Sequence, residues 1–482
     1  MTAETKNSLS FQVSVLLIYA VLGVLCLNNG YFWDTIQQIS KEAHGYYQNG
    51  FSTLLLPATD TGADAVATGY HPPLMGTITA ALWKIFGYRL WVSHAFVMLW
   101  AVVLVCNVWK LLTRFFSDRM AGWALVIVML EPTVLTQFVV ASPDFILLTA
   151  FIVALRGMLE HKPRLLALGL IVLCAVNMRG IFAGAALLAA QLYYSRLQAP
   201  SPLNLRSVSN ILLPYLPAFV LTAAYFVYYF AVRGWFFTHA AVDGHYSLPS
   251  GISAIVKHLA EYGLRSVENG RIALWLIGIY VAFHLAKKIK TLSAELKTLL
   301  LLFALLASLY LLLCCVTRMP FSARYFMPQF FLLTVLVLKG LTEIVAGRKI
   351  IVYLMVVLCF ELTGHLWVYP RKIAKPWDCT LAHLPYYGLR TECFQYIDKQ
   401  GWNYKDISGG FCLYGNRRFT ELGNADKTIS TNANNRYFIY SNVSNVDDSL
   451  LDELENPMRW TPVRQFEKGA VVIIIYEQKN HQ

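Results

Sequence analysis

Long apolar runs separated by short polar segments dominate the first 368 residues of this chain. Each run is close to the roughly 20 residues with which an α-helix crosses the hydrocarbon core of a bilayer. Hydropathy predicts about eleven such helices, so the pattern indicates an all-α polytopic membrane bundle. The helices are expected at residues 11–28, 90–112, 120–141, 143–159, 165–178, 180–195, 208–232, 271–288, 297–316, 324–343 and 351–368.

Three segments between or after these runs are too long to be simple connectors: 29–89, 233–270 and everything after 369. In the first, apolar residues recur at helical spacing, which predicts an amphipathic helix lying at the membrane surface: Ile36, Ile39, Ala43 and Tyr46 or Tyr47. A weaker pattern of the same kind covers 252–262.

The composition changes at Tyr369, after which Asn, Asp and Gly become frequent. Strand-like runs at 436–441 and 470–476 and a helix-like run at 447–455 predict a small α/β domain. A tail of about 110 residues is long enough to bury a core of its own. The sequence therefore predicts two domains, 1–368 in the membrane and 369–482 outside it.

Composition and charge agree with a membrane protein and set its orientation. Hydrophobic residues make up 57% of the chain and charged residues 14%, which excludes an ordinary soluble protein. With the N-terminus in the cytoplasm, the inner loops carry about eleven of the twelve net positive charges, as the positive-inside rule predicts. This orientation explains the basic surplus without a nucleic-acid partner. It also places the three long segments on the extracytoplasmic side.

Nine cysteines are present, of which Cys379, Cys393 and Cys412 lie in the tail. A Cys379–Cys393 disulfide and free thiols are both compatible with the spacing, because spacing does not establish disulfide geometry. His239 and His245 are a weak pattern for a metal site, and we predict none.

Candidate chemistry begins with Asp34, which directly follows Tyr31, Phe32 and Trp33 after the first helix. A carboxylate here could act as a general base. Alternatively, Asp34 and Gln37 could form a capping box that opens the surface helix.

His71 and Asp144 each have a structural and a functional interpretation. His71 precedes Pro72 and Pro73, which are typical of a helix start, but its imidazole could also face a phosphate. Asp144 follows Ser142 and a proline as expected in a helix N-terminus, yet it faces the same compartment as Asp34.

Arg179, Arg318 and Arg324 are exceptions to the charge rule, because they lie at outer helix ends where few cations are expected. The planar guanidinium group matches phosphate oxygens in two-point contact. Contact with lipid headgroups is the alternative for any one of them. Together they predict an anion site on the outer side.

In their order along the chain, these motifs resemble the GT-C superfamily of integral-membrane glycosyltransferases, in the branch of protein O-mannosyltransferases and the lipid A aminoarabinose transferase. The motifs span roughly residues 10–330. They are Trp33-Asp34, His71-Pro72-Pro73-Leu74 with the following segment to Phe86-Gly87, Pro143-Asp144 with Leu147-Leu148 and Ala154-Leu155, Met178-Arg179-Gly180, and Arg324-Tyr325-Phe326-Met327-Pro328.

The resemblance implies transfer of a sugar from a polyprenyl-phosphate donor to a glycan, lipid or protein acceptor on the outer face, with inversion at the anomeric carbon. The family often has a second acid after the first-loop aspartate, where this chain has Thr35, and an acid before the His-Pro-Pro run, where it has Tyr70. Asp60 or Asp64 could supply the second carboxylate, or could belong to an ordinary turn.

In the mechanism that we expect, the arginines neutralise the leaving lipid phosphate, Asp34 accepts the acceptor proton, and His71 supports the donor or the base. No obligate metal or other cofactor is predicted, although some related folds use divalent cations. The alternatives are a transporter or flippase of a lipid-linked substrate and a scaffold whose tail recruits partners. The overall pattern favours a bacterial inner membrane.

Overall fold

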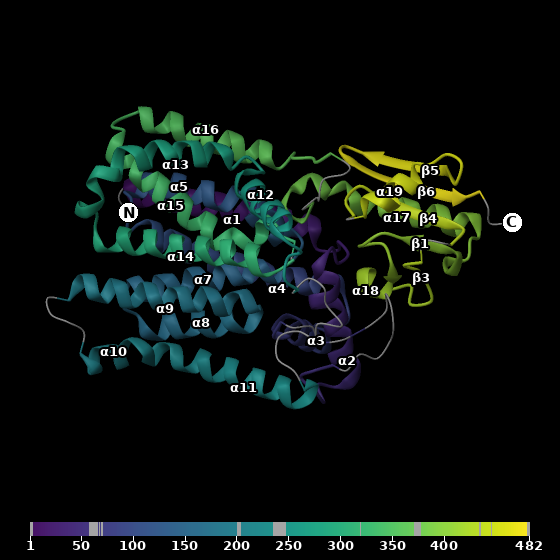
Figure 1. Cartoon of the computed structure of the whole chain (residues 1–482), viewed down its shortest axis with the longest axis horizontal. Coiled ribbons are helices and arrows are strands. Elements are labelled where there is room, and N and C mark those ends of the chain that lie inside the picture. The colour runs from purple at the N-terminus through teal and green to yellow at the C-terminus, as the bar shows by residue number, and fades with distance from the viewer. Residues whose placement is uncertain are drawn as a thin grey trace.

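The protein is a bundle of apolar helices with a small sheet domain at one end (Figure 1). The structure, a computed structural model, describes residues 3–56, 66, 68, 71–199, 204–234, 247–318, 320–370, 377–432, 435–444 and 446–479. The C-terminal domain, α2 and α3 lie beyond the end of the bundle opposite to the N-terminus (Figure 1).

Every apolar run expected from the sequence overlaps a helix of the bundle, which confirms the predicted helical architecture. The bundle helices are α1 (Ala3–Cys26), α4 (Leu90–Leu112), α5 (Asp118–Leu130), α6 (Pro132–Val139), α7 (Pro143–Leu159), α8 (Pro163–Val176), α9 (Met178–Gln198), α10 (Leu205–Leu212), α11 (Leu216–Arg233), α13 (Ile272–Leu285), α14 (Ala294–Val316), α15 (Met327–Ile344) and α16 (Lys349–Gly364).

Five helices of the described chain are long and apolar enough to cross a membrane, and a bent pair would make a sixth. The chain is therefore an integral membrane protein, while the count of eleven spans stays a prediction. The five are Leu9–Cys26, Leu90–Leu112, Leu205–Arg233, Ala294–Val316 and Ala323–Ile344.

The bent pair corrects one expected helix, because the run at 120–141 is divided into α5 and α6 at an angle of 57°. The break has a local cause at Glu131 and Pro132. Proline lacks the N–H that a continuing helix needs and instead fits the first turn of a new one. Glu131 caps this new helix by accepting a hydrogen bond from the Val134 backbone N–H at 2.8 Å.

Helix α7 is the centre of the bundle, since every one of its residues is buried. Its neighbours approach closely where the sequence has glycine. A Cβ at Gly157 would lie 2.4 Å from the Leu166 backbone, and one at Gly169 would lie 2.6 Å from the Ala154 backbone. Because α7 is central, the side chains of its N-terminal turn have fixed positions at the end of the bundle.

The long segments form further helices around that end. The segment 29–89 contains a π-helical turn, η1 (Ile36–Lys41), followed by α2 (Glu42–Asn49) and α3 (Leu74–Phe86). The segment 233–270 contains α12 (Ile252–Val267). The expected helices at 36–47 and 252–262 are thus present, and their position at the membrane surface stays a prediction. Two short 3₁₀ turns, η6 (Ala323–Phe326) and η7 (Trp377–Cys379), lie between longer elements.

The C-terminal sheet has the strand order β1-β4-β6-β5, with β1 parallel to β4 and the other pairs antiparallel. Alternation along β4 and β6 divides their side chains between two cores, as the two-residue period of a strand requires. Ile439 and Ile475 face a core with α17, whereas Tyr440 and Ile474 face a core with α19. The elements are α17 (Pro385–Gln400), β1 (Ile407–Gly409), β2 (Gly415–Asn416), α18 (Arg418–Glu421), β3 (Thr428–Ile429), β4 (Tyr437–Ser441), α19 (Asp448–Leu454), β5 (Trp460–Lys468) and β6 (Val471–Gln478).

The tail contacts the first loop directly. The Tyr31 backbone N–H donates to the Thr420 carbonyl oxygen at 2.9 Å, and a Cβ at Gly30 would lie 2.5 Å from that same oxygen. Cys379, Cys393 and Cys412 are free thiols, so the possible Cys379–Cys393 disulfide is not formed. The tail is held to the membrane part by packing, hydrogen bonds and the ion pair between Arg324 and Asp378.

Candidate active site

Charged residues from five separate segments meet at the end of the bundle that faces the C-terminal domain. They come from the segment after α1, the first turns of α7 and α9, the η6 turn before α15, and the η7 turn in the tail. We call these residues the Arg324 cluster: Asp34, Asp144, Arg179, Arg324 and Asp378.

Arg324 lies at the centre of this cluster and contacts three carboxylates. Its Nη1 is 2.8 Å from Asp378 Oδ2, its Nε is 3.5 Å from Asp144 Oδ2, and its Nη2 pairs with Asp34 Oδ2. The Arg324 side chain is only 6% exposed. A buried guanidinium that is surrounded in this way has a fixed position and a fixed charge.

Arg179 provides a second guanidinium beside the first. Its Nη2 donates to Asp144 Oδ1 at 2.7 Å, and the group stacks over the Tyr325 ring at 4.0 Å from the centroid. Asp144 therefore bridges the two arginines. The stacking holds the plane of the Arg179 fork against an aromatic face, which limits its rotation.

Both arginines are at helix N-termini, where the helix dipole disfavours a cation. Arg179 is the second residue of α9, and Arg324 precedes α15 by three residues. Helix stability does not account for these positions. The carboxylates compensate for the unfavourable dipole, and the N-terminal backbone N–H groups add further donors for an anion.

Asp144 keeps the role in helix initiation that its sequence context predicts and gains a second one. Ser142 is the N-cap of α7 and accepts a hydrogen bond from the Asp144 backbone N–H at 3.1 Å, with Pro143 in the first turn. The Asp144 side chain meanwhile binds Arg179.

Asp34 is the most accessible acid of the Arg324 cluster, with a side chain that is 33% exposed. It is presented by an unusual backbone, because Trp33 has φ of +52°. A left-handed residue other than glycine costs about 1–3 kcal/mol and is frequent at functional sites. The capping-box alternative is not formed, since η1 begins with Thr35 as its N-cap and has no side-chain cap.

His71 lies near Arg179, Asp34 and Arg324. Burial, with the two arginines as a smaller contribution, lowers its pKa to about 3, so the imidazole is neutral at physiological pH. Its Nδ1 is buried and has no hydrogen-bond partner among the described residues. A neutral histidine with an unused ring nitrogen can bind a hydroxyl or a phosphate oxygen.

Asp378 was not expected from the sequence. Its side chain is 2% exposed, and burial raises the pKa of its carboxyl group while Arg324 opposes the shift. One sequence feature could have identified it, because Trp377-Asp378 repeats the dipeptide Trp33-Asp34. The turn that carries Asp378 is attached to the bundle, since Gln137 Nε2 donates to the Asp378 backbone oxygen at 2.5 Å.

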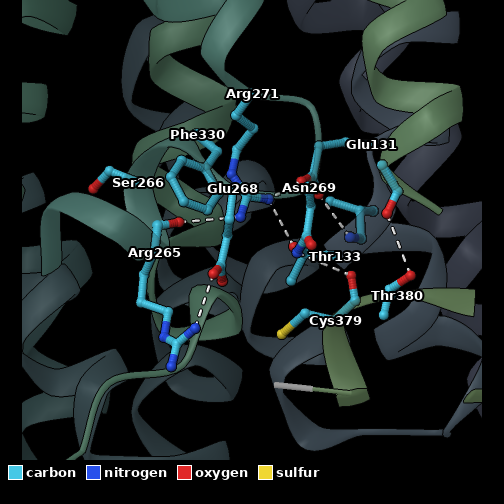
Figure 2. Close-up of polar contacts among 12 residues, drawn as sticks. Glu131, Thr133, Arg265, Ser266, Glu268, Asn269, Arg271, Phe330, Cys379 and Thr380 are labelled. Carbon is cyan, nitrogen blue, oxygen red and sulfur yellow. Dashed lines mark hydrogen bonds and ion pairs between the residues drawn. The ribbon is translucent and has the colours of Figure 1, made fainter. Parts of the chain in front are cut away.

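A second buried network supports this turn (Figure 2). Asn269 Nδ2 donates to the Cys379 carbonyl at 3.3 Å, and Thr380 Oγ1 donates to the His365 carbonyl at 2.8 Å. Nearby, the fully buried Arg271 pairs with Glu131 at the break between α5 and α6. Both residues that follow Asp378 are thus tied to the helix bundle.

Comparison with known proteins concerns the fold. No family model and no curated protein matches the sequence. Two solved structures of ArnT from Cupriavidus metallidurans align over 96% of this chain and 97% of their own. The apo structure is 11% identical with a TM-score of 0.51, and the structure bound to undecaprenyl phosphate is 12% identical with a TM-score of 0.47.

The fold is similar to that of ArnT. The apo comparison therefore confirms the expected GT-C-like fold. Because the identity is so low, the ArnT similarity concerns the architecture alone.

The other candidate residues fall outside the Arg324 cluster. Arg318 is exposed, and its Nε donates to the Leu248 carbonyl at 2.9 Å; among the described residues it forms no ion pair. The structure therefore separates Arg318 from the other two arginines. Asp60, Asp64, His239 and His245 lie outside the described residues.

Within the described ranges no three His, Cys, Asp or Glu side chains are arranged to hold a metal ion. The three carboxylates of the Arg324 cluster surround a guanidinium group instead. Independence from metal stays a prediction.

Proposed function

We propose that this protein is an integral-membrane glycosyltransferase that transfers a sugar from a polyprenyl-phosphate donor to an acceptor on the extracytoplasmic face. One observation carries the proposal: two arginines and an accessible carboxylate meet at one end of the bundle. An ArnT-like fold supports it, and one of the two ArnT structures contains undecaprenyl phosphate.

Arg179 and Arg324 bind the donor phosphate in this proposal. Their guanidinium groups share Asp144, so both can direct N–H donors at one anion. Arg179 is 16% exposed and Arg324 6%, which places both at the boundary of a medium with low dielectric constant. Electrostatic stabilisation of a developing phosphate charge is strongest in such surroundings.

Asp34 is the general base. Its exposure of 33% leaves part of the carboxylate accessible to an acceptor hydroxyl, whereas Asp144 and Asp378 are 5% and 2% exposed. Arg324 pairs with Asp34, so donor phosphate that binds Arg324 Nη2 releases the Asp34 oxygen for the acceptor. The base and the leaving-group site are thereby coupled through one guanidinium.

The reaction balances with these groups alone. The acceptor oxygen forms a bond to the anomeric carbon, and the bond from that carbon to the phosphate oxygen breaks. The electron pair of the broken bond remains on the phosphate, where the arginines stabilise it. The acceptor proton moves to the Asp34 carboxylate. Attack opposite to the leaving phosphate inverts the anomeric carbon.

The orientation of the protein follows from charge. Arg114, Lys288 and Arg348 lie at or near bundle helix ends away from the Arg324 cluster, and basic residues mark cytoplasmic ends. With this orientation, the Arg324 cluster and the C-terminal domain face the extracytoplasmic side. We propose that the membrane is a bacterial inner membrane.

Purified protein incubated with a panel of radiolabelled polyprenyl-phosphate sugars and a membrane extract tests the proposal. We expect a labelled acceptor with the wild type and transfer that is at least about a hundredfold slower with Asp34→Asn, which should still bind the lipid. If Asp34→Asn transfers sugar normally, Asp34 is not the base. If the wild type moves labelled lipid across vesicle membranes without transferring sugar, the protein is a flippase.

A further inference from the structure

The C-terminal domain contributes a charge to the Arg324 cluster that the proposed reaction does not use. Asp378 Oδ2 lies 2.8 Å from Arg324 Nη1, and its other carboxylate oxygen accepts a hydrogen bond from the neighbouring Cys379 thiol at 3.5 Å. The side chain is 2% exposed. It is therefore too enclosed to act as a base toward a bulky acceptor.

Asp378 also holds its place firmly. The Gln137 side chain donates a hydrogen bond to the Asp378 carbonyl. Asn269 donates to the carbonyl of the next residue, Cys379, and Thr380 is hydrogen-bonded to the end of α16 (Figure 2). Trp377 before it is 1% exposed. Unlike Asp34, which an incoming phosphate can displace, Asp378 is a stationary negative charge beside the phosphate site.

This charge makes the protein groups of the site negative overall. Two guanidinium groups face three carboxylates, so the formal charge is −1 when all three are ionised. The neighbouring His71 is neutral because burial lowers its pKa, and Cys379 is neutral because burial raises its pKa. A polyprenyl-phosphate sugar is a phosphodiester with one negative charge. The lipid phosphate that remains after transfer is a monoester, which carries up to two because its second pKa is about 6.

We propose that Asp378 makes the Arg324 site discriminate against the product lipid phosphate, by repelling its second negative charge more than it repels the donor. This inference rests on the proposed function and adds a role for the C-terminal domain. The domain supplies a residue that positions Arg324 and promotes product release. Transfer makes the anion more highly charged, and that change itself weakens its binding.

The test compares two defined lipids, undecaprenyl phosphate and its methyl ester, which mimic the charges of product and donor. Because Coulomb energy is proportional to ligand charge, the logarithm of the affinity change in Asp378→Asn should be twice as large for the monoester. At pH 8 we expect about tenfold tighter monoester binding and about threefold tighter diester binding. Product inhibition should increase by the same factor as monoester affinity.

Two variants control for structural damage. Asp378→Glu retains the charge and should retain the discrimination. Glu160→Gln removes a carboxylate that pairs with Arg156 at 2.7 Å beside the C-terminal end of α7, the end opposite to Asp144, and should leave the binding of both lipids unchanged. Equal changes for both lipids in Asp378→Asn, or weaker binding of both, would overturn the inference.

The wild type provides a second test that needs no variant to fold. Between pH 5 and pH 8 the monoester acquires its second charge, so its binding should weaken, while binding of the methyl ester changes less. Monoester binding that tightens with rising pH would overturn the inference. If the wild type binds neither lipid, the proposed function fails; if it binds both without discrimination, this inference alone fails.

Discussion

Replacing Arg324 by glutamine would remove the cation that three carboxylates share, and the structure predicts where the cost lies. Asp144 retains Arg179 at 2.7 Å, and Asp34 is 33% exposed and can be hydrated. Asp378 is 2% exposed, and in the described part of the chain no other cation contacts it. The destabilisation should therefore come mainly from one uncompensated buried carboxylate.

Removal of one partner from a buried ion pair costs about 3–5 kcal/mol. We expect Arg324→Gln to lower the free energy of unfolding by about that amount. Asp378→Asn should cost less, about 1–3 kcal/mol, because Arg324 keeps two other carboxylates. The double variant leaves no unpaired buried charge at Asp378, so it should recover at least about 2 kcal/mol relative to Arg324→Gln.

Equilibrium unfolding in mixed detergent micelles would measure the four free energies of this double-mutant cycle. Arg318→Gln is the matched control, since Arg318 is exposed and bonded to a backbone carbonyl, and should change stability by less than about 0.5 kcal/mol. A coupling energy near zero, or a double variant less stable than Arg324→Gln, would refute the assignment of Asp378 as the main unpaired charge.

Three further predictions concern the reaction. Asp34→Asn should lower the turnover number about 10²- to 10⁴-fold while donor binding is retained, and an unchanged turnover would exclude Asp34 as the base. His71 has a pKa of about 3 and stays neutral between pH 5 and pH 8. His71→Gln should therefore leave the shape of the pH–rate profile in that range unchanged, and the loss of an inflection near pH 6 would contradict this. Transfer should survive chelation with EDTA, because the arginines neutralise the phosphate; activity restored only by Mg²⁺ or Mn²⁺ would argue against them.

Hydropathy was sufficient to place the helices because membrane-spanning runs are long and strongly apolar. It missed the break before α6, since Glu131 and Pro132 interrupt an otherwise apolar run for only two residues. In the tail, β4 and β6 could be predicted because their residues form hydrophobic runs, and these residues are mostly buried in the structure. Strand β5 was not, since it lies at the sheet edge with most of its side chains exposed and a bulge beside Pro462.

The sequence could predict those site residues that are charged and lie at outer helix ends. Asp34, Asp144, Arg179 and Arg324 all stood out, because a charged residue at an outer helix end is unusual. Arg318 was a candidate for the same reason, but it lies outside the Arg324 cluster. Sequence position gives the depth of a residue along a helix but not the direction that its side chain takes from a nonhelical segment.

Asp378 was beyond such reasoning, because its position depends on how the tail packs against the bundle. That packing depends on buried charges that are poor sources of stability, since the desolvation of Arg271 and Glu131 offsets much of their attraction. Their contribution is geometric. Arg271 holds the start of α6 against the turn before α13, α6 carries Gln137, and the turn carries Asn269. Those two amides hold the carbonyl groups of Asp378 and Cys379. The Arg271–Glu131 pair thus positions the acid that the tail contributes to Arg324, and a change in this pair should alter lipid selectivity without touching the site.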